Sequence, residues 1–214
     1  MKHGLIGCSF VGVWEKPLQA IPEFDRRFSL NLFGDPYSTT CGFTPEGYVI
    51  AKQFAPSPQP SVIISPARIQ VSELTITRVT EVYSQVFQEL KQQFPHDMMF
   101  PFSSIGINSE HEWLELESTS ETILNKRFFA NLLYSQSDTE RILPFDVRFE
   151  WRFKDQTKLN VLLQPRAGIP NGVFAGINDD RFWSEKPLPN SELILDLFTE
   201  SVANVKTKVA GLLN

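Results

Sequence analysis

Ten residues in the second half of the chain alternate without error between apolar and charged side chains: Phe145-Asp146-Val147-Arg148-Phe149-Glu150-Trp151-Arg152-Phe153-Lys154. Successive side chains of a β-strand point to opposite faces of its sheet, so this pattern predicts a strand with one apolar and one charged face. We expect the apolar side chains to face helices and the charged ones to face outward. Such strands belong to antiparallel sheets that are covered on one face only.

The residues that follow predict two further strands. Residues 155–157 form a turn sequence, after which apolar residues alternate again over residues 159–163. Pro170-Asn171-Gly172 is a second, strong turn signal, and residues 173–177 then form the next strand. Short turns of this kind join antiparallel neighbours, so the region predicts a meander of three strands.

Two more strands are expected upstream, over residues 102–107 and 112–117. Ile105 occupies an odd position in the apolar pattern, whereas Leu114 occupies an even one. A single straight strand would therefore move its apolar side chains from one face to the other. We place a turn at residues 108–111, so that the two segments form a hairpin.

The first 71 residues predict four short strands, separated by proline and glycine turn signals. The expected strands cover residues 6–14, 26–33, 48–54 and 61–71. In the second of them Phe28, Leu30 and Leu32 alternate with polar residues. Pro66 lies within the fourth, which suggests an edge strand or a bulge because proline cannot donate to the ladder.

In three segments the apolar residues recur about every 3.6 residues, and not every 2 as in the expected strands. This spacing is typical of amphipathic helices. Residues 79–94 carry apolar residues at three- and four-residue steps and stop at Pro95. A second helix follows Ser118, which forms a capping box with Glu121. A third, long helix begins at Ser191.

These elements predict an α+β fold with the order ββββ-α-ββ-α-βββ-α and an antiparallel sheet covered by helices on one face. We expect residues 1–214 to form a single domain, since no linker or change in composition marks a boundary. A helix followed by a hairpin occurs over residues 76–117 and again over 119–164, which suggests a duplicated α-ββ unit.

Composition argues against several classes of function. The chain carries 20 basic and 25 acidic residues, a net charge of −5, whereas nucleic-acid binding needs a basic surface. The sequence lacks a P-loop, a dinucleotide-binding glycine motif, a nucleophile elbow and a zinc-protease motif. Two cysteines and three histidines suggest neither a disulfide framework nor a metal site. We expect a cytoplasmic protein with no cofactor, no metal and no membrane segment.

Two places carry residues with chemical potential. His111 lies between two glutamates in the expected 108–111 turn, where the sequence favours a solvent-exposed imidazole over an acid–base catalyst. The interpretation as an exposed turn predicts that His111→Ala changes stability by no more than about 0.5 kcal/mol.

The second place is Asn178-Asp179-Asp180, which favours a turn that ends its strand. Phe182 and Trp183 would then anchor the following segment to the core. The alternative is a binding site. Its candidate residues are Asp179, Asp180, Phe182 and Trp183.

Without a catalytic constellation, the sequence favours a non-catalytic protein that binds a protein partner or assembles with itself. The last helix carries apolar residues along its whole length, and we expect its second half, including Val205 and Val209, to lie in a homodimer interface. One alternative is a small-molecule site between the sheet and this helix, suggested by the glycines of the first strand, Gly4, Gly7 and Gly12. Another is an enzyme without a recognisable motif, using His111 or a carboxylate.

Overall fold

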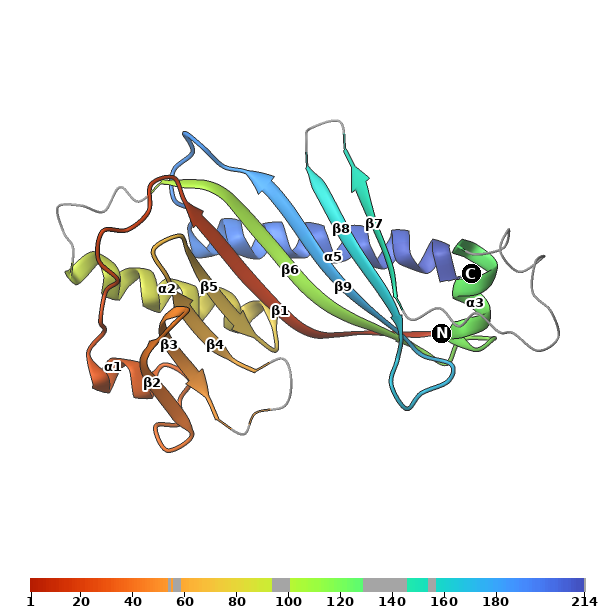
Figure 1. Ribbon diagram of the computed structural model, residues 1–214, viewed down its shortest axis with the longest axis horizontal. Helices are drawn as coiled ribbons and strands as arrows, with labels where there is room; N and C mark the ends of the chain where they lie inside the picture. Colours follow the sequence, from red (N-terminus) through yellow and green to blue (C-terminus); the bar gives the residue numbers. More distant parts are fainter. Residues whose placement is uncertain (54, 56–58, 94–100, 129–145, 154–156, 214) are drawn as a thin grey trace.

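The computed structural model describes residues 1–53, 55, 59–93, 101–128, 146–153 and 157–213. Its strands are β1 Lys2–Trp14, β2 Thr39–Thr44, β3 Gly47–Lys52, β4 Ser61–Ile64, β5 Arg68–Glu73, β6 Phe102–Leu114, β7 Val147–Arg152, β8 Lys158–Pro165 and β9 Val173–Phe182. Its helices are α1 Arg26–Asn31, α2 Ile76–Gln93, α3 Ser120–Phe128 and α5 Ser191–Leu213. The strands form one open sheet in the order β2-β3-β4-β5-β1-β6-β9-β8-β7, and every neighbouring pair is antiparallel (Figure 1). The predicted α+β class is confirmed.

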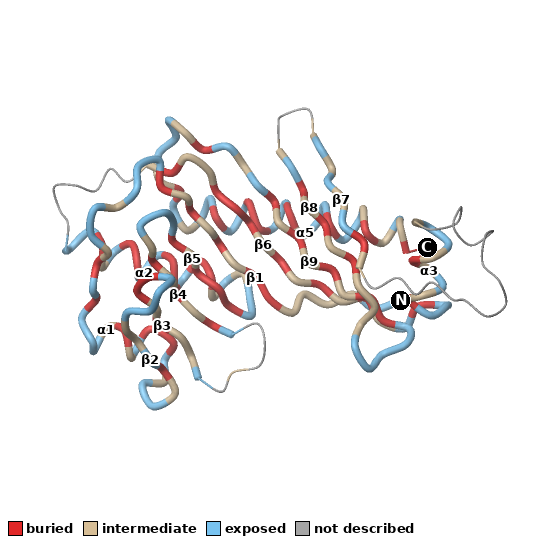
Figure 2. Tube along the Cα trace, in the orientation of Figure 1, coloured by how far each residue is buried: buried red, intermediate tan, exposed pale blue. Residues whose placement is uncertain are grey.

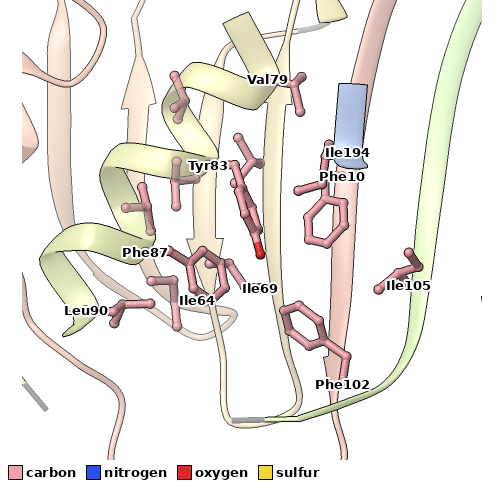
Figure 3. Packing of buried hydrophobic residues seen from close by; sticks show 14 of the residues in the cluster. Phe10, Ile64, Ile69, Val79, Tyr83, Phe87, Leu90, Phe102, Ile105 and Ile194 are labelled. Atoms are coloured by element: carbon pink, nitrogen blue, oxygen red, sulfur yellow. The ribbon is translucent and has the colours of Figure 1, made fainter. Parts of the chain in front are cut away.

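Helices α2 and α5 cover one face of this sheet (Figure 1). Strands β1 and β6 run through the middle, and Figure 2 shows buried positions along both of them. Tyr83 and Phe87 of α2 point at the sheet and meet Phe10 and Phe102 from these two strands (Figure 3). The amphipathic pattern of the predicted helix therefore buries its apolar side against the sheet.

A second apolar cluster lies under the C-terminal half of α5 and includes residues of α3, β7, β8 and β9. Within β7, Val147 is buried and Phe149 and Trp151 are partly buried in this cluster, whereas Arg148 and Glu150 are exposed. The predicted orientation of this strand is thus confirmed. Residues 145 and 154, the ends of the alternating stretch, lie outside the described residues.

Gly12 of β1 gives a first testable prediction, because it leaves room for the ring of Phe102. A Cβ atom on Gly12 would lie 2.3 Å from two ring carbons of Phe102, which is itself fully buried. We expect Gly12→Ala to lower the free energy of unfolding by about 1–3 kcal/mol, because a packed core cannot absorb the extra methyl group. Urea denaturation measures the loss. Gly211→Ala is the control, since its Cβ would meet no atom within 4 Å. Equal stability of the two variants would contradict the prediction.

The expected strand over residues 26–33 is wrong, because this segment contains helix α1. The Asp25 carboxylate accepts hydrogen bonds from the backbone N–H groups of Arg27 and Phe28, at 2.8 and 3.1 Å. This N-cap satisfies donors that a helix end otherwise leaves unpaired. Phe28 and Leu32 are also four residues apart, so they fit one face of a helix as well as one face of a strand.

The segment over residues 61–71 is a hairpin, not one strand with a bulge. Strands β4 and β5 pair through a turn at residues 65–67, in which the Ser65 hydroxyl accepts a hydrogen bond from the Arg68 backbone N–H at 3.1 Å. Pro66 therefore lies in the turn, where it interrupts no ladder.

The converse error concerns residues 102–117, where the predicted hairpin is a single strand. Strand β6 runs without a turn from Phe102 to Leu114 and pairs with β1 and β9 along its length. The helix-facing side chains after Ile107 are Ser109, His111 and Trp113, which keep the odd positions. The strand does not switch faces, because Trp113 and not Leu114 is the core residue.

The helix caps lie next to the predicted ones. The Thr119 hydroxyl accepts a hydrogen bond from the Thr122 backbone N–H at 3.3 Å, so it takes the place predicted for Ser118. The Asn190 side chain accepts from the Leu193 backbone N–H at 2.8 Å and takes the place predicted for Ser191.

The apolar side of α5 is covered within the same chain. Val205 and Val209 have 0% exposed surface and belong to the second apolar cluster. Because these side chains are already covered within one chain, they give no reason to place this helix in a homodimer interface, as the sequence had suggested. No helix within the described residues combines the length and the apolar character needed to cross a membrane.

Candidate functional site: a polar groove on the open face of the sheet

An open cavity of about 850 Å³ lies on the sheet face that α2 and α5 leave uncovered. It is lined by residues from seven consecutive strands of the sheet, from β4 to β7. In a flat sheet the first and last of these strands would lie about 29 Å apart, at about 4.8 Å per step. Because Ser61 of β4 and Glu150 of β7 line the same cavity, the sheet curves around it.

The centre of the groove is a row of directly paired polar residues that crosses the strands. On its first three strands the row consists of serines, with Ser61 of β4 opposite Ser72 of β5, and Ser72 opposite Ser9 of β1. All three line the cavity. Side chains directly opposite each other on neighbouring strands are close enough to interact, so the serines form a continuous strip of hydroxyl groups.

The row continues as asparagines on the next three strands. Ser9 pairs with Asn108 of β6, Asn108 with Asn178 of β9, and Asn178 with Asn160 of β8. Glu150 of β7, opposite Asn160, ends the row. Together these seven residues, which we call the polar row, place hydroxyl, amide and carboxylate groups along one line.

Glu110 lies beside the polar row, at a place where the residues opposite it on both neighbouring strands have no side chain. Its neighbours across the strands are Gly7 and Gly176, and no described residue makes a hydrogen bond or ion pair to its carboxylate. Burial raises the pKa of Glu110, and the charge of Arg166 opposes this shift. Arg166 itself pairs with Glu112 at 3.3 Å.

The three asparagines of the polar row donate their side-chain N–H groups to other side chains of the protein. Asn108 donates to the Ser9 hydroxyl at 3.2 Å. Asn178 and Asn160 both donate to the same oxygen of Asp180, at 3.0 and 3.2 Å. The Oδ1 atom of Asn108, in contrast, is shielded from solvent and has no hydrogen-bond partner within the described chain. This oxygen lies beside Gly106, 3.6 Å from the position that a Cβ on Gly106 would occupy.

The opposite, helix-covered face holds a separate buried polar cluster at the seam between the two apolar clusters. Its members are fully or almost fully buried. They are Ser109 and His111 of β6, Asp179 of β9 and Ser201 of α5. We call this set the buried seam. It divides the apolar residues under α2 from those under the second half of α5.

His111 occupies the centre of a hydrogen-bonded chain in the buried seam. Its Nδ1 atom lies 2.9 Å from Nε2 of His3, and its Nε2 atom lies 2.8 Å from the Ser109 hydroxyl. Burial lowers the pKa of His111 to about 4, and the neighbouring His3 acts in the same direction. A serine hydroxyl next to an imidazole resembles a nucleophile and its base, but both side chains are closed off from any substrate.

The expected exposed turn at His111 is therefore wrong, and the expectation that His111→Ala changes stability by no more than about 0.5 kcal/mol loses its basis.

Asp179 and Arg181 form a buried ion pair on the same face. Two nitrogens of the Arg181 guanidinium donate to the two carboxylate oxygens of Asp179, at 3.1 and 2.9 Å. A third nitrogen donates to Glu200 of α5 at 3.1 Å. This two-pronged geometry is the strong form of an arginine–carboxylate contact, and it ties β9 to the helix above.

The four residues predicted as a binding site do not come together. Asp179 and Asp180 lie within β9, not in a turn, so they point to opposite faces of the sheet. Asp180 lies beside the groove, where partial burial raises its pKa and the Asn178 hydrogen bond opposes the shift. Phe182 is 69% exposed. Trp183 is buried and donates its indole N–H to the Pro187 carbonyl at 2.9 Å, so its expected anchoring role is confirmed.

The polar row was not predicted from the sequence, although a signal for it was present. Asn108 and Glu110 alternate with buried residues in β6, and Asn178 and Asp180 do the same in β9. Placing turns at both segments hid this alternation. The groove does not lie between the sheet and α5, where a cavity was suggested, but on the opposite face of the sheet. Gly12, one of the glycines that motivated it, accommodates Phe102 and no ligand.

No family model, curated protein or solved structure matches this chain.

Proposed function

We propose that this protein binds a small polar molecule, rich in hydrogen-bond donors, in the groove on the open face of its sheet. The polar row carries the proposal, because seven hydrophilic side chains from seven strands line up inside one cavity. A sheet face exposed only to water needs polar side chains, but it needs neither a curved cavity nor a half-buried carboxylate without a partner on its floor.

The size and chemistry of the groove support such a ligand. Small-molecule sites typically enclose about 300–1,000 Å³, and the groove falls within this range. Most such sites are lined mainly by apolar residues, whereas this one adds a continuous row of serine, asparagine and glutamate side chains to apolar neighbours such as Phe149 and Leu162. It therefore favours a hydrophilic ligand over an apolar one. Binding to a protein partner stays a prediction, because it has no comparable described feature in its support.

The test is ligand-observed NMR with a panel of small hydrophilic compounds: inositol, glucose, glucosamine, 1,4-butanediol and 1,4-diaminobutane. We expect at least one of them to bind the wild-type protein. Asn178→Leu should abolish this binding, because it removes the amide at the middle of the polar row and fills the groove.

Gln88→Leu makes the same chemical change on the exposed side of α2, outside the groove, and should leave binding intact. Both variants are checked for folding by thermal denaturation. If no compound binds the wild-type protein, or if Asn178→Leu binds as well as Gln88→Leu, the proposed function is wrong.

A further inference from the structure

Glu110 is a carboxylate without a partner inside the groove. Its side chain is half-buried, and no described residue donates a hydrogen bond to it or pairs with it. The nearest opposing charge, Arg166, is held by Glu112 at 3.3 Å. A partly desolvated carboxylate that lacks such contacts is unfavourable, and its raised pKa has the same origin. The site would be stabilised by an external cation or hydrogen-bond donor.

Asn108, two positions from Glu110 on β6, offers no second acceptor to the same ligand group. Its Oδ1 atom is shielded from solvent and lies beside Gly106, 3.6 Å from the position that a Cβ on Gly106 would occupy. Gly106 and Glu110 lie on opposite sides of Asn108 along the strand, so recognition at this place depends on the Glu110 carboxylate.

We propose that the ligand of the groove is recognised through a protonated amine, which the Glu110 carboxylate binds. This inference rests on the proposed function and names the chemical class of the ligand. An ammonium group has three N–H donors and can contact both carboxylate oxygens of Glu110 at once. The glycines on either side of Glu110, Gly7 and Gly176, leave the carboxylate open to such a group.

The charges around the groove favour a cation over an anion. Arg148, which also lines the cavity, is paired with Asp146 at 3.2 Å. Glu150 at the end of the polar row is likewise paired, with Arg152, whereas Asp180 beside the row adds negative charge. A phosphate or carboxylate ligand would meet Glu110 and Asp180 without an unpaired cation among the described lining residues.

The test compares matched ligands that differ only in the amine: 1,4-diaminobutane against 1,4-butanediol, and glucosamine against glucose. We expect the amine of the better-binding pair to bind at least about tenfold more tightly, since a charge-assisted contact is roughly twice as strong as a neutral one. Glu110→Gln keeps the shape and removes the charge, so it should abolish this preference. Glu110→Asp keeps the charge and should retain it.

Glu46→Gln, at the exposed turn between β2 and β3, removes the same charge outside the groove and serves as the control. A preference that persists in Glu110→Gln would overturn the inference, and so would equal binding of amine and alcohol by the wild-type protein. Equal binding would leave the proposed function standing. The absence of binding by every compound would overturn both.

Discussion

Replacing Arg181 with methionine is expected to lower the free energy of unfolding by about 3–5 kcal/mol, the loss typical when one partner of a buried ion pair is removed. The variant would leave Asp179, which is 2% exposed, without the two hydrogen bonds that its carboxylate accepts. It would also break the contact to Glu200, which joins β9 to α5. Urea denaturation at neutral pH measures the loss.

The matched control is Lys2→Met, which breaks an ion pair between two exposed side chains, Lys2 and Glu115. Exposed pairs contribute at most about 1 kcal/mol, so this variant should be close to the wild-type protein in stability. The double variant Asp179→Leu/Arg181→Met removes both charges and should regain much of the stability that Arg181→Met loses. A loss below about 1 kcal/mol in Arg181→Met would show that Asp179 does not depend on this partner.

Side-chain periodicity predicted those elements whose one face is uniformly apolar. Strand β7 and helices α2 and α5 satisfy this condition, and the structure confirms all three. Helix α1 did not meet this condition, and local hydrogen bonds determine its helical conformation. Its short alternation is compatible with both a strand and a helix, and the Asp25 cap selects the helix.

Strand β6 was not predicted as one continuous strand, because its buried face is partly polar. Ser109 and His111 interrupt the apolar pattern between Ile107 and Trp113, although all four residues face the helices. A polar residue can occupy such a position only when its hydrogen bonds are made inside the protein. The partner here is His3, more than a hundred residues away in the sequence. No local pattern contains that information.

The groove was hidden for a related reason. Each strand contributes only one side chain to the polar row, and the seven positions are scattered from Ser9 to Asn178. They align only through the strand register, which depends on the pairing of the whole sheet. Glu110 was visible in the sequence as a neighbour of His111. That it lacks a hydrogen-bond or ion-pair partner among the described residues agrees with the two glycines opposite it, Gly7 and Gly176 on the neighbouring strands.

The second large effect concerns His111, whose folded-state pKa of about 4 makes stability depend on pH. The ordinary pKa of histidine is 6.5, so between pH 6.5 and 4 the unfolded chain binds a proton that the folded protein does not. Stability is therefore lost as the pH falls through this window and is present in full above it. The lowered pKa of His3, caused by burial and then by Lys206, acts in the same direction.

At about 1.4 kcal/mol per pH unit, His111 accounts for a loss of about 3 kcal/mol by pH 4. His111→Phe removes this titration and keeps a ring in the core, but it leaves Ser109 and His3 without their shared partner. We expect the variant to be about 2 kcal/mol less stable than the wild-type protein at pH 7.

The two stabilities should converge on acidification and become equal or reverse near pH 4, because only the wild-type protein must protonate or expel a buried imidazole. Chemical denaturation of both proteins at half-unit steps from pH 7.5 to 4 measures the difference between them, so carboxylates that titrate in both proteins cancel. A difference that stays constant with pH would mean that His111 titrates as it does in the unfolded chain. The hydrogen-bonded chain from His3 to Ser109 would then be open to water rather than sealed beneath α5.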